Sequence, residues 1–167
     1  MLVGLLRYWV RIMIREASVD DVDEIVHVIN ESNYHAYRSI IPDEYFKHPV
    51  VSRDEILEDM RRMRFYVYEV EGRIVGVAAL QPKLDEKVGI IRWVYVHPEH
   101  QRRGIGTALI KHIENIALSL NLEKLRLVTH EKAHWAIRFY EKLGYRAVSY
   151  IQRIAWKDIL MEKTLKQ

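Results

Sequence analysis

A short basic loop that carries two glycines is the part of this chain whose residue types and spacing best suit chemistry. Residues 101–106, Gln-Arg-Arg-Gly-Ile-Gly, follow an apolar run that ends at Val96, and a helical pattern begins directly after them. The first turn of a helix has N–H groups without partners and a partial positive charge, so it attracts anions. Glycine lets the backbone approach such a ligand and adopt positive φ without steric penalty. The loop therefore predicts a site for a phosphate-bearing cofactor.

Two familiar phosphate-binding loops do not fit this stretch. A Walker loop requires a lysine directly after its last glycine, and Thr107 follows Gly106 here. A dinucleotide fingerprint requires a third glycine three residues further on, where Leu109 stands, and its strand opens a βαβ unit early in the chain. The pattern is instead Gln-x-x-Gly-x-Gly.

A second motif lies further along the chain, after the strand-like run at residues 124–129. Residues 136–145 read Ala-Ile-Arg-Phe-Tyr-Glu-Lys-Leu-Gly-Tyr. Apolar residues recur in this segment at helical spacing, and Gly144 is placed to end the helix in the left-handed conformation. The segment thus predicts a helix whose buried face includes Phe139 and Tyr140.

The loop resembles the coenzyme A pyrophosphate loop of the GNAT superfamily of N-acetyltransferases, and the helix is similar to the A-x-x-F-Y-E-K-x-G-F segment of that superfamily. The two motifs also have the order and separation found there, and the resemblance runs from about Ile12 to Leu165. It implies an α/β (α+β) GNAT fold, in which a mixed, mostly antiparallel sheet is flanked by helices. It also implies acetyl-CoA as cosubstrate, with no metal, and acetyl transfer to a primary amine of a small molecule or a protein.

The resemblance assigns roles to particular residues of this chain. It makes Tyr140 the general acid, since its neutral hydroxyl can donate a proton at pH 7. One position departs from the superfamily pattern, because Ala133 stands where an asparagine often contacts the cofactor. The residues assigned to cofactor binding are Val94, Tyr95, Val96, Gln101, Arg102, Arg103, Gly104, Ile105, Gly106 and Thr107.

The acceptor side is less defined. Glu31, Tyr34 and Tyr37 lie in a stretch similar to the segment that lines the acceptor side in many superfamily members, so we expect them to bind substrate. The central strand carries no glutamate that could serve as general base. The candidates for that role stay open: Glu31, Tyr34, His35, His97 or an ordered water.

A rival motif is the His130-Glu131-Lys132-Ala133-His134 segment, a literal H-E-x-x-H. A zinc hydrolase needs both histidines on one face of one helix, together with a third ligand. Here His130 directly follows a strand-like run, so the two histidines are expected to straddle a strand-to-helix turn. Zinc hydrolysis is the remote alternative, and a non-catalytic acyl-CoA-binding module is the other.

Composition indicates one ordinary globular domain over residues 1–167. Of the 167 residues, 49% are hydrophobic and 29% charged. The net charge of +3 is a weak excess that does not argue for a nucleic-acid partner. The chain has no cysteine, which excludes disulfides, cysteine metal sites and a cysteine nucleophile. Dimers are common in the superfamily, so a homodimer is compatible with the resemblance.

The first fourteen residues are apolar apart from Arg7 and Arg11, too short for a membrane span, and without the pattern of a signal peptide. We therefore expect a cytoplasmic protein with no membrane partner. Residues 1–12 are interpreted as an extension, which forms an extra strand or lies upstream of a true start at Met13. Asparagine and glutamine are scarce beside charged and β-branched residues, which favours a thermophilic source.

Periodicity predicts the elements that position the two motifs. Capping boxes at Ser18 and Ser52 open two helices, and the stretch 30–49 between them is interpreted as irregular. A helix follows the loop. The predicted strands cover residues 12–15, 65–70, 73–80, 88–96, 124–129, 146–154 and 157–165.

Overall fold

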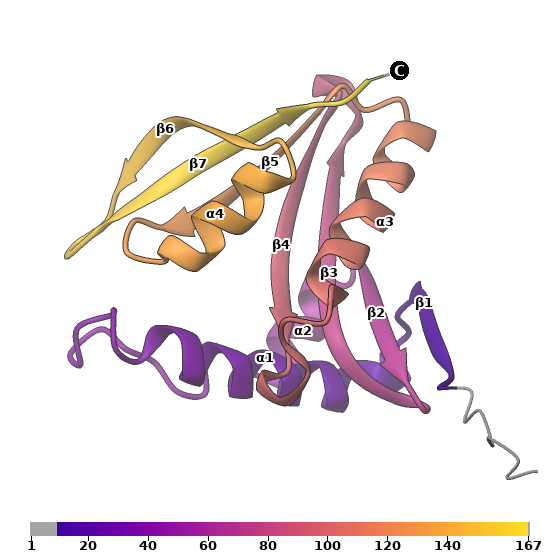
Figure 1. Ribbon diagram of the computed structural model, residues 1–167, viewed down its shortest axis with the longest axis horizontal. Helices are drawn as coiled ribbons and strands as arrows, with labels where there is room; N and C mark the ends of the chain where they lie inside the picture. Colours follow the sequence, from indigo (N-terminus) through magenta and orange to yellow (C-terminus); the bar gives the residue numbers. More distant parts are fainter. Residues whose placement is uncertain (1–9, 167) are drawn as a thin grey trace, which may run out of the picture.

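The computed structural model describes residues 10–166, which form one seven-stranded sheet with helices on both faces (Figure 1). In sheet order the strands are β1 (Ile12–Glu16), β2 (Arg64–Val70), β3 (Arg73–Lys83), β4 (Val88–Val96), β5 (Lys124–His130), β7 (Lys157–Thr164) and β6 (Arg146–Gln152). The helices are α1 (Val22–Tyr37), α2 (Arg53–Asp59), α3 (Ile105–Ser119) and α4 (His134–Lys142). The predicted α/β (α+β) fold is confirmed. Of the predicted extension, residues 1–9 lie outside the described residues, and Ile12 already belongs to β1.

Neighbouring strands are antiparallel except for β4 and β5, which run parallel. The tight turn between β2 and β3 has φ of 51° at Glu71 and 77° at Gly72, as a two-residue hairpin loop of the primed type requires. The parallel pairing lasts only from Val88 with Lys124 to Ile90 with Arg126. Beyond Ile90 the two strands diverge, and β5, β6 and β7 swing away from β4 (Figure 1).

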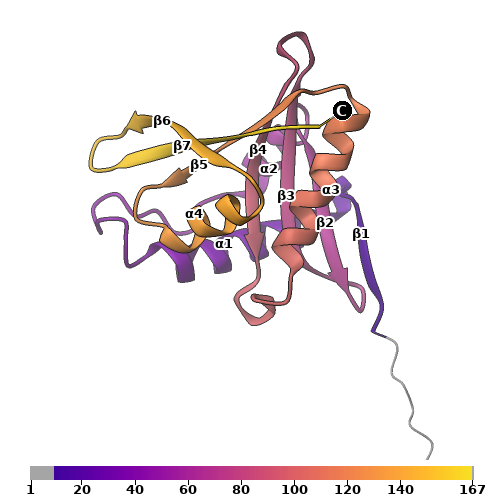
Figure 2. The same cartoon turned by 45° about the horizontal axis from the view of Figure 1, so that its top comes forward.

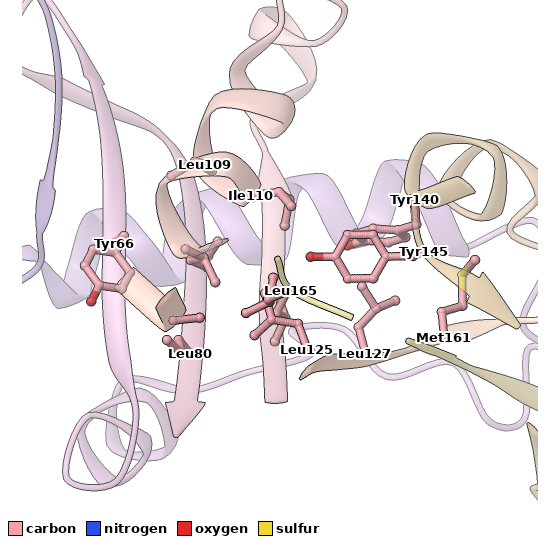
Figure 3. Packing of buried hydrophobic residues seen from close by; sticks show 14 of the residues in the cluster. Tyr66, Leu80, Leu109, Ile110, Leu125, Leu127, Tyr140, Tyr145, Met161 and Leu165 are labelled. Atoms are coloured by element: carbon pink, nitrogen blue, oxygen red, sulfur yellow. The ribbon is translucent and has the colours of Figure 1, made fainter. Parts of the chain in front are cut away.

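The sheet separates two apolar cores. Helix α3 lies over one face, and its Leu109, Ile110 and Ile113 pack with residues of β3, β5 and β7 in a cluster that reaches Tyr140 of α4 (Figures 2 and 3). Helices α1 and α2 cover the other face, where Ile25 and Ile56 are completely buried. Strand β3 is buried on both faces because it lies between these cores. Within residues 10–166, no helix is long and apolar enough to cross a membrane.

Helix α1 is longer than its sequence predicts. The stretch 30–49 was expected to be irregular from its first residue, but α1 continues to Tyr37, so that prediction is wrong for residues 30–37. Apolar periodicity fades there because the buried face becomes polar at Ser32 and Asn33. Asn33 is satisfied inside the protein, since its side-chain N–H donates to the Tyr95 hydroxyl over 3.1 Å.

Strand β4 carries a bulge just before its end. Ala79 of β3 pairs with Arg92 and Val77 pairs with Tyr95, so two residues of β4 face one of β3. One of the two, Trp93, has φ of 55°, a conformation that costs an L-residue about 1–2 kcal/mol. Its indole N–H donates to the Asp59 carboxylate over 2.8 Å, and Asp59 is only 6% exposed. This bond ties the bulge to the C-terminal end of α2.

A cluster of charges ties β1 to β2 and to the start of α1. The Arg15 guanidinium donates to both oxygens of Asp21 at 2.7 and 2.8 Å and to Glu69 at 2.6 Å. Asp21 also accepts the Ser18 backbone N–H over 2.8 Å, as the predicted capping box requires. The hydrogen bonds from Arg15 hold the pKa of Asp21 below its ordinary value.

We expect Asp21→Asn to lower the free energy of unfolding by about 1–2 kcal/mol at pH 7, since the Arg15 contact is charge-assisted but partly screened by solvent. The folded-state pKa of Asp21 is depressed, so its contribution is present above the unfolded pKa of about 4 and is lost as pH falls through the folded pKa. The variant should therefore lose less stability than the wild type on acidification. Urea denaturation at pH 7 and pH 3 measures both effects.

Asp20→Asn is the matched control, because Asp20 is the exposed neighbour of Asp21 in the same turn. The pKa of Glu162 is also depressed, chiefly by Arg126, so some acid sensitivity should persist in both variants. If the two variants show the same loss at pH 7, the Arg15 to Asp21 contact is not stabilising.

Candidate cofactor site and active site

The divergence of β4 and β5 opens a cleft of about 1030 Å³. Its walls come from the second half of α1, the end of β4, the loop from residue 97 to residue 104, the start of α3, the end of β5, and α4. Segments far apart in the sequence thus meet at one cleft, beside the point where the parallel pairing stops.

Strand β4 presents a free backbone edge to this cleft. On its other side Tyr95 and Val96 pair with β3, at Val77 and Gly76. On the cleft side, no strand of residues 10–166 pairs with β4 beyond Ile90. The backbone groups of residues 94–96 that do not bond to β3 or to Gln101 are therefore open to a ligand with amide groups of its own, as an added strand would be.

The loop that follows β4 is folded so that the N-terminus of α3 faces the cleft. Gly104 is the N-cap with φ of 78°, and the first helical bond runs from the Ala108 N–H to the Gly104 carbonyl. The intervening N–H groups of Ile105, Gly106 and Thr107 have no intrahelical partner, and all three residues line the cleft. The Gln101 side chain donates to the Val96 carbonyl over 3.0 Å, which ties the loop to the end of β4.

Gly106 packs closely against α4. A Cβ at this position would lie 3.2 Å from the Phe139 ring, so the ring would have to shift by a few tenths of an ångström. The first motif of the sequence therefore contacts the second here, because Phe139 belongs to α4 and Gly106 to α3. Both residues line the cleft.

Three tyrosines from three elements line the cleft: Tyr37 of α1, Tyr95 of β4 and Tyr140 of α4. Burial raises the pKa of each hydroxyl, and the Tyr37 and Tyr95 hydroxyls raise the pKa of Tyr140 further. Tyr140 packs against Phe139 and Tyr145, with ring centroids 5.0 and 5.8 Å apart (Figure 3). The Tyr140 hydroxyl therefore stays protonated throughout the physiological pH range.

Most residues that the sequence assigns to the cofactor lie on this cleft. They are Val94, Tyr95, Val96, Gln101, Arg102, Gly104, Ile105, Gly106 and Thr107, together with Tyr140 and Tyr37 from the other two assignments. Arg103 is exposed and is not among the lining residues. Neither are Glu31 and Tyr34. Tyr34 packs instead on His48, with ring centroids 4.8 Å apart.

The H-E-x-x-H segment is divided between two elements. His130 is the last residue of β5 and His134 is the first of α4, so the histidines do not share a helix face. His130 stacks on Trp156 at 5.3 Å and its Nδ1 accepts the Lys132 backbone N–H over 3.0 Å. Glu131 accepts the Lys157 backbone N–H over 2.9 Å. The segment thus forms a turn that joins β5 to α4, and residues 10–166 contain no group of side chains that could hold a metal ion.

Sequence reasoning missed several side chains of the cleft, among them Ser32, Arg92, Trp93, Trp135 and Arg153. The lone charge in the otherwise apolar strand 88–96 was the available signal for Arg92. A charged side chain in the middle of an apolar strand must reach solvent or a polar partner, and here it reaches the cleft. No sequence pattern marks the others, which reach the cleft only through the fold.

Comparisons with known proteins agree with this geometry. Residues 27–145 match the family model "Acetyltransferase (GNAT) family". Amino-acid acetyltransferases of Ralstonia nicotianae and Pseudomonas syringae are 33% and 29% identical over 125 and 123 residues, which cover 75% and 74% of this chain but only 25% and 26% of theirs. The chain thus spans about a quarter of the length of these curated relatives.

Solved structures share the fold at low identity. The PaiA N-acetyltransferase of Thermoplasma acidophilum in complex with coenzyme A has a TM-score of 0.81 at 23% identity, over 92% of this chain and 99% of that one. The ribosomal-protein-S18-alanine N-acetyltransferase of Escherichia coli has a TM-score of 0.78 at 18% identity, over 94% and 96%. The spermidine N-acetyltransferase of Vibrio cholerae, in complex with CoA and spermine, has a TM-score of 0.72 at 21% identity, over 92% and 95%.

The role of the positive φ at Gly104 can be tested by comparison with a second glycine that has nearly the same φ. We expect Gly104→Ala to lower the free energy of unfolding by about 1 kcal/mol, because alanine disfavours the φ of 78° found there. Relief of that strain should also turn the N–H groups of the loop away from the cleft and weaken acetyl-CoA binding about tenfold, the worth of one charge-assisted hydrogen bond. Thermal unfolding and calorimetric titration measure the two effects.

Gly72→Ala provides the control. Gly72 has φ of 77° in the β2–β3 turn, and a Cβ at either glycine meets nothing within 4 Å. The control should show the same stability loss with unchanged acetyl-CoA affinity. Equal affinities in the two variants would mean that the loop does not hold the cofactor.

Proposed function

Because the chain belongs to the GNAT acetyltransferase family, we propose that it is an acetyl-CoA-dependent N-acetyltransferase that acts on a primary amine. The observation that carries this proposal is the meeting of three features in one cleft: a free β4 edge, the N-terminus of α3, and the buried hydroxyl of Tyr140. The first two suit the pantetheine arm and the pyrophosphate of coenzyme A, and the third supplies the proton donor that the reaction needs.

The residues present fit the cofactor. The N-terminus of α3 supplies three unpartnered N–H groups and the positive end of the helix dipole for the pyrophosphate, and Arg102 adds a positive charge at the same rim. The unpaired edge at residues 94–96 is complementary to the amide groups of the pantetheine arm. When bound, acetyl-CoA supplies the acetyl group as an activated thioester.

Tyr140 is suited to the proton-donating step. Its raised pKa keeps the hydroxyl neutral, so it can donate a proton to the sulfur that departs from the acetyl group. Burial in an apolar wall excludes water from the donor. Burial also raises the pKa of Tyr37 and Tyr95, so these hydroxyls stay neutral beside it.

The proton acceptor comes from a short set of candidates. Glu31, Tyr34 and His97 are not among the residues that line the cleft, whereas His35 is. This supports His35, directly or through a water, as the group that takes the proton from the acceptor amine.

We expect acetyl-CoA to bind with a micromolar dissociation constant in a calorimetric titration that contains EDTA. Binding without metal supports the assigned cofactor. Absence of binding would mean that residues 101–106 are only a strand-to-helix turn, and the proposal would be wrong.

Tyr140→Phe tests catalysis separately from cofactor binding. We expect kcat to fall about 100-fold or more with the acetyl-CoA affinity unchanged, since the substitution removes only the donated proton. Release of coenzyme A can be followed with a thiol reagent without background, because the chain has no cysteine.

Tyr145→Phe is the matched control. Tyr145 is buried beside Tyr140 but donates to Glu114 over 3.3 Å and does not line the cleft, so its variant should keep kcat. Unchanged turnover in Tyr140→Phe would make that tyrosine a packing residue. Cofactor binding with no turnover of any amine would favour a non-catalytic acyl-CoA-binding module.

A further inference from the structure

The charges that line the cleft are of one sign. Among the described residues on its walls there are three arginines, Arg92, Arg102 and Arg153, and no aspartate or glutamate. Arg102 belongs to the loop proposed to hold the pyrophosphate. The other two come from β4 and from the connection between β6 and β7, so the positive charge extends beyond the cofactor end of the cleft.

Arg92 lies on the acceptor side of the sheet. It pairs with Ala79, and directly paired residues point to the same face. Ala79 belongs to the core beneath α1 and α2, opposite to the face that α3 covers. From this face the second half of α1 contributes Ser32, His35 and Tyr37 to the cleft.

The guanidinium of Arg92 contacts an aromatic ring but is not neutralised. It lies 5.6 Å from the centre of the Trp93 ring, and the Trp93 indole is fixed by its bond to Asp59. Among residues 10–166, no carboxylate forms an ion pair with Arg92. Its five donors are therefore available to a ligand.

Two carboxylates that contact residues of the cleft wall are already engaged. Asp59 accepts from Trp93 at 2.8 Å and from Arg62 at 2.7 Å, and it is nearly buried. Asp158 accepts from Arg153 at 2.7 Å and from the Trp156 indole at 3.0 Å. Arg153 is thus already paired, which leaves Arg92 as the cation of the acceptor side with its charge free.

We propose that the acceptor is a small amine that carries a carboxylate, as an α-amino acid does, and that Arg92 binds this carboxylate. This inference rests on the proposed function. Arg92 precedes the β4 edge at residues 94–96 by two residues, so the strand rise places its Cα at most about 7 Å from the start of that edge, within reach of a guanidinium side chain. In an α-amino acid a single carbon separates amine and carboxylate, so the amine then lies near the thioester. A polyamine is positively charged and requires carboxylates for binding, so the arginines of this cleft would repel it.

The experiment compares acceptors that differ only in this charge. L-Glutamate, L-methionine and L-leucine are each assayed beside their α-amides, with spermidine and a peptide with a free N-terminus as the other classes. Release of coenzyme A is the readout. We expect at least one free amino acid to exceed its amide in kcat/KM by about 10- to 100-fold, the range for a hydrogen bond to a charged group.

Arg92→Gln should remove that preference, through a higher KM for the amino acid and no change for the amide. Arg92→Lys should keep part of it, because the charge stays while the planar fork is lost. Arg73→Gln is the matched control, an exposed arginine at the start of β3 outside the cleft. Unchanged acetyl-CoA affinity and Tm in the Arg92 variants establish that the fold is intact.

The outcomes separate this inference from the proposed function. Acetylation of spermidine or the peptide in preference to every amino acid would overturn the inference and leave the transferase proposal standing. Equal turnover of acids and amides, or an Arg92→Gln variant that keeps the preference, would do the same. If acetyl-CoA binds and no amine of any class is acetylated, the proposed function itself is wrong.

Discussion

The short parallel pairing between β4 and β5 is the constraint on which the rest of the structure depends. Three residue pairs hold the strands together, from Val88–Lys124 to Ile90–Arg126, and the sheet then opens. A continuous parallel pair would bury the backbone of residues 94–96 in the ladder and leave no cleft. The bulge at Trp93 lies just beyond the last β4–β5 pair, and Asp59 holds it by accepting the indole N–H. This buried hydrogen bond offsets the conformational free energy that the positive φ of Trp93 costs.

One half of the cleft is formed mainly by backbone groups and the other mainly by side chains, which explains what the sequence could predict. The half proposed to hold the cofactor consists largely of backbone: the β4 edge, the N–H groups of α3, and glycines that permit their geometry. Backbone sites require particular residues at fixed spacing, so residues 101–106 and Gly144 could be interpreted locally. The φ of 95° at Gly144 confirms the predicted left-handed end of α4, and the N-cap at Gly104 confirms that a helix begins at the loop. The strand bounds differ from the prediction by a few residues at most.

The half proposed to hold the acceptor consists of side chains that only the fold brings together. The polar buried face of α1 hid the continuation of the helix to Tyr37, since Ser32 and Asn33 break the apolar pattern on which the prediction relied. The connection between β6 and β7 brings Arg153 to the same cleft as Arg92, although the two residues lie far apart in the chain. No local sequence pattern predicts that two residues so distant in sequence line the same cleft in the fold. Trp135 and Thr129 reach the cleft in the same way, from opposite sides of the turn that the H-E-x-x-H segment forms.

The charge of the cleft connects its two halves. Under the proposed function, the helix N-terminus and Arg102 would attract the phosphates of the cofactor, and Arg92 extends the positive charge of the cleft toward α1. A cationic acceptor would enter against this potential, whereas an anionic one would be drawn in, and the field acts before any contact forms. The burial of Tyr37, Tyr95 and Tyr140 adds to this selection, because phenols with raised pKa values contribute no negative charge to compensate a cation. A cleft with unpaired cations and only neutral hydroxyls is therefore complementary to anions both at the proposed cofactor end and at the proposed acceptor end.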